Sequence, residues 1–226
     1  MQQKNSPIIT KRIAQTMSIL GPFTQKLQTP LDPLVAVRNN DPFRALISTI
    51  LTAQTKDQVS APVSQALFVS LGDTTSELAN APISHIEDII RQVSYYKTKA
   101  RHIQKTASII HTVYKDVVPR TYEELIALPG VGPKTANLML GEVFGIPAIC
   151  VDIHVHRISN RLGIIRTKTR EQSLKALEQT LPKKYWIPYN NILVKLGQMI
   201  CRPISPKCSE CPAKDFCPKI GVTSKR

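Results

Sequence analysis

Apolar residues recur three and four positions apart along most of the chain, and no stretch alternates in the two-residue period of a β-strand. The clearest example follows Asp41 and Pro42, where apolar residues fall at the i, i+3, i+4, i+7 and i+8 positions of a helix: Phe43, Leu46, Ile47, Ile50 and Leu51. Aspartate is a good N-cap and proline suits the first position of a helix. The pattern therefore predicts a helix that begins at Pro42, buries one face and ends at or just before Gln54.

Capping and breaking residues predict further helices along the chain. Ser84 and Thr121 each stand three residues before a glutamate, as in a capping box. Residues 56–68 have a helical pattern that Pro62 is expected to kink or restart. The other predicted helices cover 99–114, Pro133 to Gly145, Asp152 to Gly163, about 170–180 and about 189–200. These elements together predict an all-α fold of short helices on short loops.

The charge of the chain indicates a polyanionic partner. It has 226 residues, with 30 Lys and Arg against 16 Asp and Glu, and so a net charge of +14. Nucleic acid is the first candidate for this partner and an anionic membrane surface the second. The alternative explanation of the charge is solubility or a basic proteome, with no such partner. No apolar run approaches the roughly 18 residues needed to span a bilayer, and the basic residues are not gathered on one amphipathic helix. We therefore expect no membrane association.

The N-terminal residues lack the charged and then apolar pattern of a secretory leader. An intracellular protein, cytoplasmic or associated with the nucleoid, is expected. In a reducing compartment, clustered cysteines bind metal more often than they form disulfides. Cys150 lies apart from the cluster in an apolar run and is predicted to be a buried core thiol.

The other four cysteines follow the spacing Cys201-x6-Cys208-x2-Cys211-x5-Cys217. Four thiolates at this spacing are suited to one metal centre. The segment has four prolines and few apolar residues, so it needs a cross-link such as a bound metal centre to fold. By softness and geometry alone, four cysteines suit tetrahedral zinc as well as they suit an iron–sulfur cluster.

A glycine-rich run, Leu128-Pro-Gly-Val-Gly-Pro-Lys134, predicts a helix, a tight hairpin and a second helix. Glycines at 130 and 132 allow positive φ and close backbone approach. The second helix presents unpaired N–H groups and the positive end of its dipole, which form an anion site that suits a DNA phosphate.

Lys134 and Asp152 are the candidate chemical groups. The dipole at a helix start disfavours a cation, and basic neighbours and partial burial are expected to favour the neutral amine of Lys134. A neutral amine can attack an electrophilic carbon and form a Schiff base, whereas a charged one would simply pair with a phosphate. Asp152 is a predicted N-cap, and its carboxylate could stabilise an oxocarbenium at a sugar C1′ or move a proton. The alternative for Asp152 is an ordinary cap.

The run from Leu128 to Ala136, followed by Val151-Asp152-Ile-His154, resembles the helix-hairpin-helix DNA glycosylases. Leu51-Thr-Ala-Gln54-Thr-Lys-Asp57 and the cysteine spacing are similar to the endonuclease III branch of that family. The resemblance extends from about residue 35 to Cys217. It departs from the pattern at Pro133, where many relatives carry a basic residue, which would remove one phosphate contact without loss of chemistry.

The resemblance implies two helical domains, one continuous over 36–146 and one formed by 1–35 with 147–226. The second would hold a [4Fe–4S] cluster, in preference to zinc, on the four cysteines of the 201–217 loop. Lys134 would be the nucleophile and Asp152 the essential carboxylate. The residues that the resemblance places against DNA are Gln54 in the gap left by the extruded base, Tyr95 as a wedge opposite it, Gly130, Val131 and Gly132 of the hairpin, and His154.

The activity implied is that of a bifunctional DNA glycosylase and AP lyase. It would bind duplex DNA with damaged bases or abasic sites as a monomer, excise oxidised pyrimidines and cut the strand by β-elimination through a lysine Schiff base. Adenine-excising relatives lack a lysine at position 134 and carry a further C-terminal domain, which favours this subtype. The alternatives are a monofunctional or mismatch-directed glycosylase of the same fold and a DNA-binding protein without catalysis.

Overall fold

A computed structural model describes residues 6–226, and every regular element in that range is helical. The all-α prediction is therefore confirmed. The chain divides into two compact units, Pro30–Phe144 and the described residues up to Thr29 together with Gly145–Arg226. The predicted boundaries were 36–146 and the remainder. Residues 1–5, which carry most of the N-terminal leader argument, lie outside the described range.

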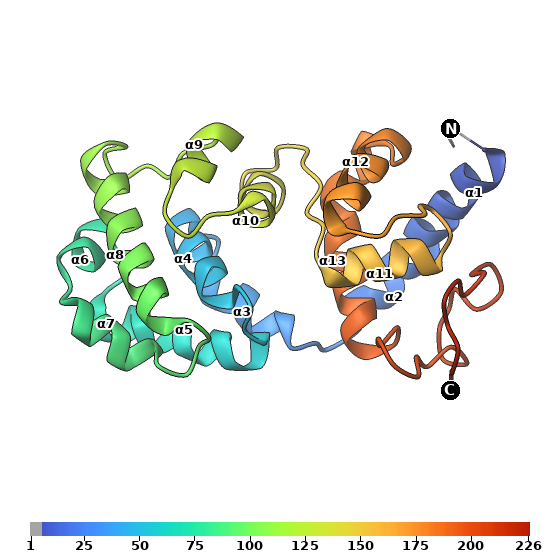
Figure 1. Cartoon of the computed structure of the whole chain (residues 1–226), viewed down its shortest axis with the longest axis horizontal. Helices are drawn as coiled ribbons and strands as arrows, with labels where there is room; N and C mark the ends of the chain where they lie inside the picture. The colour runs from blue at the N-terminus through green and yellow to red at the C-terminus, as the bar shows by residue number, and fades with distance from the viewer. Residues whose placement is uncertain (1–5) are drawn as a thin grey trace. The chain divides into compact units, whose positions relative to one another are not determined.

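The unit Pro30–Phe144 is a bundle in which α8 packs against α4, α6 and α7 (Figure 1). Apolar residues predicted on the α4 face are all buried, including Leu46 and Ile47 at 0% exposure. The helices of this unit are α3 (Leu31–Arg38), α4 (Pro42–Thr52), α5 (Asp57–Leu71), α6 (Thr75–Asn80), α7 (Ile83–Ile90), α8 (Tyr96–Thr112), α9 (Tyr122–Ala127), α10 (Pro133–Leu138) and the π-helix η2 (Met139–Val143).

The other unit packs α13 against α11 and α2 around its own apolar core (Figure 1). Tyr189 is fully buried there and its hydroxyl bonds to that of Ser159 at 2.9 Å. Cys150 is 3% exposed, which confirms the predicted core thiol. The elements are α1 (Pro7–Gln15), η1 (a π-helix, Thr16–Leu20), α2 (Gly21–Gln25), α11 (Ile153–Arg161), α12 (Arg170–Thr180), η3 (a 3-10 helix, Lys183–Tyr185) and α13 (Trp186–Met199).

Three of the helix starts predicted from a capping residue have side-chain caps, at Asp41, Thr121 and Asp152. The Asp41 carboxylate accepts a hydrogen bond from the backbone N–H of Arg44 at 2.7 Å. The Thr121 hydroxyl accepts one from the backbone N–H of Glu124 at 3.3 Å. Local capping chemistry was sufficient to locate these helices.

The capping box predicted at Ser84 is wrong. Helix α7 begins at Ile83 after an extended Pro82, and Ser84 lies within the first turn. Proline fixes φ and has no N–H, so the helix starts directly after it. A capping box that the sequence analysis missed begins α6, where Thr74 and Glu77 exchange hydrogen bonds.

Other details of the predicted helices also differ from the structure, including the bounds of 99–114, which is α8 at Tyr96–Thr112. Helix α5 runs through Pro62 without a restart, with Ala61 and Val63 buried on either side. The helix from Pro133 changes to the wider π form after Leu138, and α13 begins at Trp186. Across residues 6–226, no helix has the length and apolar character required to cross a bilayer.

Candidate functional site

The predicted hairpin is present between α9 and α10. Its turn is closed by the backbone N–H of Val131, which donates to the Leu128 carbonyl at 3.1 Å. Gly130 has a φ of +79°, in the left-handed region, and a Cβ there would lie 3.0 Å from Nδ1 of His102. Glycine is therefore required at this position by both conformation and space.

Helix α8 supports the hairpin from one side. The hydroxyl of Thr106 donates to the Pro129 carbonyl at 2.8 Å. Gly132 does not use the positive φ that glycine allows, since its φ is −101° and its ψ is 179°. Gly132 is the N-cap of α10, and no atom of the chain lies within 4 Å of where its Cβ would be. Its missing side chain leaves the start of α10 open to a partner.

Lys134 is the second residue of α10, as predicted, and its side chain is exposed. The partial burial expected for it is absent. Helix α10 lies beside α4 within the same unit (Figure 1). Lys134 is thus an exposed residue on a helix that packs against α4.

Gln54 and Tyr95 lie in two exposed turns that the structure joins. Both have left-handed backbones, with φ of 55° and 57°. The turns meet because the hydroxyl of Thr55 accepts the backbone N–H of Ser94 at 3.2 Å. Residues predicted separately from sequence therefore belong to one surface region.

The sequence analysis missed Lys99, which is buried beneath these turns and is 5% exposed. Its ammonium donates hydrogen bonds to two carbonyl oxygens and one hydroxyl of the Gln54 turn. Burial lowers the pKa of Lys99 to about 8. The signal was available, since Lys99 stands four residues before Ile103 on the apolar face of α8.

Asp152 is the N-cap of α11, as predicted, and is 8% exposed. Its Oδ1 accepts the backbone N–H groups of His154 and Val155, both at 2.8 Å. His154 is half-buried, and its Nδ1 lies 3.1 Å from Nη2 of Arg157. Asp152 and His154 belong to the unit that contains Gly145–Arg226, whereas Lys134, Gln54 and Tyr95 belong to Pro30–Phe144.

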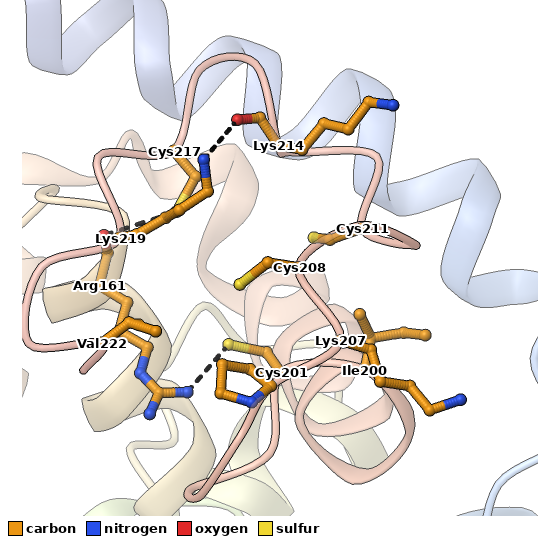
Figure 2. A pocket seen from close by; sticks show the side chains of 11 residues that line it. Arg161, Ile200, Cys201, Lys207, Cys208, Cys211, Lys214, Cys217, Lys219 and Val222 are labelled. Carbon is orange, nitrogen blue, oxygen red and sulfur yellow. Dashed lines mark hydrogen bonds between the residues drawn. The ribbon is translucent and has the colours of Figure 1, made fainter. Parts of the chain in front are cut away.

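The four clustered cysteines line one pocket in the irregular loop after α13 (Figure 2). All four are half-buried and free of disulfides. Arg161 of α11 holds this loop against the helix through three hydrogen bonds from its guanidinium. They go to Sγ of Cys201 at 3.4 Å, the Arg202 carbonyl at 2.7 Å and the Pro203 carbonyl at 2.7 Å.

The pocket disfavours bare thiolates. Burial, together with the other cysteines, raises the pKa of Cys211 to about 11 and raises that of Cys217. A bound cationic centre would reverse this effect, because metals bind thiolates. The donor set is that of a thiolate-bound centre. Within residues 6–226, no three Cys, His, Asp or Glu side chains are grouped as they would be around a single metal ion.

Residues 47–183 match the model of the HhH-GPD superfamily of base excision DNA repair proteins. The chain belongs to this family. It is 43% identical over 180 residues to endonuclease III of Thermotoga maritima, a match that covers 80% of this chain and 84% of the relative. It is 37% identical to endonuclease III of Bacillus subtilis, over 79% of this chain and 82% of that one. The predicted resemblance is confirmed.

Other relatives in the family are longer. The chain is 40% identical to a chloroplastic endonuclease III homologue of Arabidopsis thaliana, but the match covers only 48% of that protein. Among solved structures, it is similar to a non-covalent endonuclease III–DNA complex, with 32% identity, a TM-score of 0.81, and coverage of 92% of this chain and 95% of that one. A trapped covalent endonuclease III–DNA intermediate gives 32% identity, a TM-score of 0.75, and coverage of 92% and 96%.

Proposed function

We propose that this protein is a bifunctional DNA glycosylase and AP lyase of base excision repair that acts on oxidised pyrimidines. The observation that carries the proposal is Lys134, an exposed lysine in the first turn of the helix after the hairpin. Membership of the family and similarity to a trapped covalent endonuclease III–DNA intermediate support it. The net charge of +14 supports a DNA partner.

In the proposed reaction, the damaged nucleotide first leaves the base stack. The Lys134 amine attacks C1′ of the sugar, a C1′–N bond to the lysine forms, and the bond to the base breaks with its electron pair leaving on the base. Ring opening then yields the Schiff base. Loss of a proton from C2′ and cleavage of the C3′–O bond complete the β-elimination, which cuts the strand on the 3′ side of the lesion.

Asp152 is proposed as the carboxylate that stabilises positive charge at C1′ as the base departs. Its two backbone hydrogen bonds at the start of α11 hold the carboxylate in one orientation. Because the same bonds cap the helix, the proposal gives Asp152 a structural and a chemical role. These roles can be separated by substitution.

The proposed DNA contacts divide into phosphate contacts and contacts with bases. Gly130 and Gly132 are proposed to offer backbone N–H groups to a phosphate. Val131 is buried and its N–H already donates to the Leu128 carbonyl, so its proposed part in the contact is to hold the turn closed. Gln54 is proposed to fill the gap left by the extruded base, and Tyr95 to wedge the opposite strand. His154 is proposed as a further contact, although its bond to Arg157 and close packing on Gly197 also give it a structural role.

We propose that Cys201, Cys208, Cys211 and Cys217 bind a [4Fe–4S] cluster. Their convergence on one pocket, in a proline-rich loop with few apolar residues, supports this choice. The cluster would hold the loop in place, and no step of the reaction passes through it. A brown protein that contains iron and sulfide would support the proposal, and a colourless protein with one zinc would overturn it.

The protein is further proposed to work as a monomer in the compartment that holds the cell's DNA. Its substrate would be duplex DNA with damaged bases or abasic sites. Elution as a monomer from a sizing column, with and without a DNA duplex, would test the first statement.

The function is tested by trapping with borohydride. The protein is incubated with a duplex that carries one thymine glycol, borohydride is added, and a covalent complex is sought on a denaturing gel. Lys134→Gln is expected to abolish the complex and strand cleavage while DNA binding persists. Lys105→Gln is the matched control, because Lys105 is also exposed and lies on α8.

Each rival function predicts a different result. Normal cleavage by Lys134→Gln would overturn the assignment of the nucleophile. Release of free base without a trapped complex would indicate a monofunctional glycosylase. Binding with neither base release nor strand cleavage, on this duplex and on an abasic one, would leave a DNA-binding protein without catalysis.

A further inference from the structure

One buried ammonium group lies at the meeting point of the Gln54 and Tyr95 turns. Nζ of Lys99 donates to the carbonyl oxygens of Leu51 and Ala53, each at 2.7 Å, and to the hydroxyl of Thr55 at 3.1 Å. An ammonium has three N–H donors, so this set of acceptors uses all of them. Leu51 and Ala53 stand at the C-terminal end of α4, where a cation is favourable.

Lys99 also reaches the second turn. Its backbone N–H donates to the Tyr95 carbonyl at 3.0 Å. The Thr55 hydroxyl, which accepts from the Lys99 ammonium, accepts in addition from the backbone N–H of Ser94 at 3.2 Å. The bond to Tyr95 is the first backbone bond of α8, which any residue except proline would make at this position. The Lys99 side chain therefore holds the Gln54 turn directly and the Tyr95 turn through the Thr55 hydroxyl.

Both turns need such support. Gln54 and Tyr95 have left-handed backbones, which cost energy for any residue with a side chain. Burial does not hold either side chain, because Gln54 is exposed and Tyr95 is 68% exposed. The hydrogen bonds around Lys99 are side-chain contacts that help to fix the backbone on which the two exposed side chains stand.

We propose that Lys99 is a positioning residue that holds Gln54 and Tyr95 in one fixed arrangement for entry into the DNA duplex. The inference rests on the proposed function, in which these two side chains meet the DNA around the extruded nucleotide. Lys99 is too buried to touch DNA itself. It acts by ordering the two turns before DNA arrives, so that binding does not have to order them.

The first test needs no DNA. Hydrogen exchange is measured by mass spectrometry on the whole protein and on Lys99→Met, which keeps the apolar stem and removes the three donors. We expect faster exchange in peptides that cover 51–56 and 91–96 and unchanged exchange elsewhere in the chain. Thr55→Val, which removes only the shared hydroxyl, should produce a smaller change in the same two segments and serves if Lys99→Met does not fold.

The second test measures binding to a duplex with a tetrahydrofuran abasic analogue, at fixed salt. Lys99→Met is expected to bind roughly tenfold more weakly because it must order two turns on binding. Lys105→Met removes the same charge from an exposed position of the same helix and is expected to bind within about twofold of the wild type. The difference between the two variants isolates the positioning effect from loss of charge.

The third test is a double-mutant cycle. If Lys99 works through Gln54 and Tyr95, then Gln54→Ala and Tyr95→Ala should each weaken binding in the wild type and have little further effect in Lys99→Met. A merely structural lysine would leave the effects additive.

The outcomes separate this inference from the proposed function. Unchanged exchange at 51–56 and 91–96, or additive substitutions, would overturn the positioning role of Lys99. A wild-type protein that binds the abasic duplex no better than an undamaged one would instead overturn the proposed function, and with it the DNA part of the inference. Faster hydrogen exchange confined to 51–56 and 91–96, together with non-additive effects of the substitutions on DNA binding, would support the positioning role of Lys99.

Discussion

Two substitutions at Asp152 separate the helix cap from the chemistry. Asp152→Asn keeps an oxygen that can accept the backbone N–H groups of His154 and Val155, whereas Asp152→Ala keeps none. Asparagine and aspartate are comparable N-caps, and alanine is a poor one. The pair therefore varies the charge in one protein and removes the cap in the other.

The expected changes in stability follow from these contacts. Loss of an N-cap costs about 0.5–2 kcal/mol, so Asp152→Ala should lose that amount of folding free energy. Loss of a negative charge at a helix start costs about 0.3–1 kcal/mol, which applies to Asp152→Asn. For a chain of 226 residues, about 2–4 °C of Tm is lost per kcal/mol, which gives about 1–8 °C for alanine and about 1–4 °C for asparagine.

The loss of activity should not follow the loss of stability in the two variants. If the carboxylate stabilises charge at C1′, both variants should lose about 100-fold or more in the rate of base release. Thermal unfolding and single-turnover cleavage of a thymine glycol duplex, well below both Tm values, measure the two effects. Wild-type cleavage by Asp152→Asn would leave Asp152 as a cap alone. An Asp152→Asn protein that unfolds as readily as Asp152→Ala would assign its loss of activity to the helix start.

Three further predictions concern other parts of the chain. Gly130→Ala should destabilise the protein by about 1–2 kcal/mol in urea unfolding, because Gly130 has a left-handed backbone and lies against His102; no loss would contradict the hairpin geometry. Cys208→Ser should lose iron and visible absorbance, whereas Cys150→Ser should keep both, and iron retained by Cys208→Ser would remove that residue from the ligand set. Burial lowers the pKa of Lys99 from 10.5 to about 8, so between these values the unfolded chain holds a proton that the folded one lacks. The unfolding free energy of the wild type relative to Lys99→Met should thus rise from pH 8 to pH 10.5 and be flat below pH 8. A difference that falls over that range would contradict the lowered pKa of Lys99.

Local patterns were enough to locate most helices and the candidate residues. The spacing of apolar residues after Pro42 corresponds to the buried face of α4, and Asp152 caps α11 as its position suggested. These features depend on interactions within one or two helical turns. The residues that make them are close together in the sequence, so the sequence pattern shows them. Where two local signals competed, as at Pro82 and Ser84, the stronger backbone constraint of proline decided the start of the helix.

The exposure of Lys134 could not be read from its position in a helix. The sequence places it in the first turn of α10, but whether its side chain is covered depends on which elements pack nearby. Gly132 is a similar case, since the hairpin left its conformation open between a left-handed and an extended backbone. The structure has the extended one.

By itself, the sequence determined the all-helical class, the hairpin, the nucleophile candidate and the cysteine spacing. Only the tertiary structure decided that the Gln54 and Tyr95 turns meet and that Lys99 supports both. The Lys99 side chain bonds to Leu51, 48 residues earlier in the chain, and such a contact leaves no spacing rule in the sequence. Helical periodicity records short-range contacts, whereas the burial of an ammonium among carbonyl groups depends on how separate helices pack.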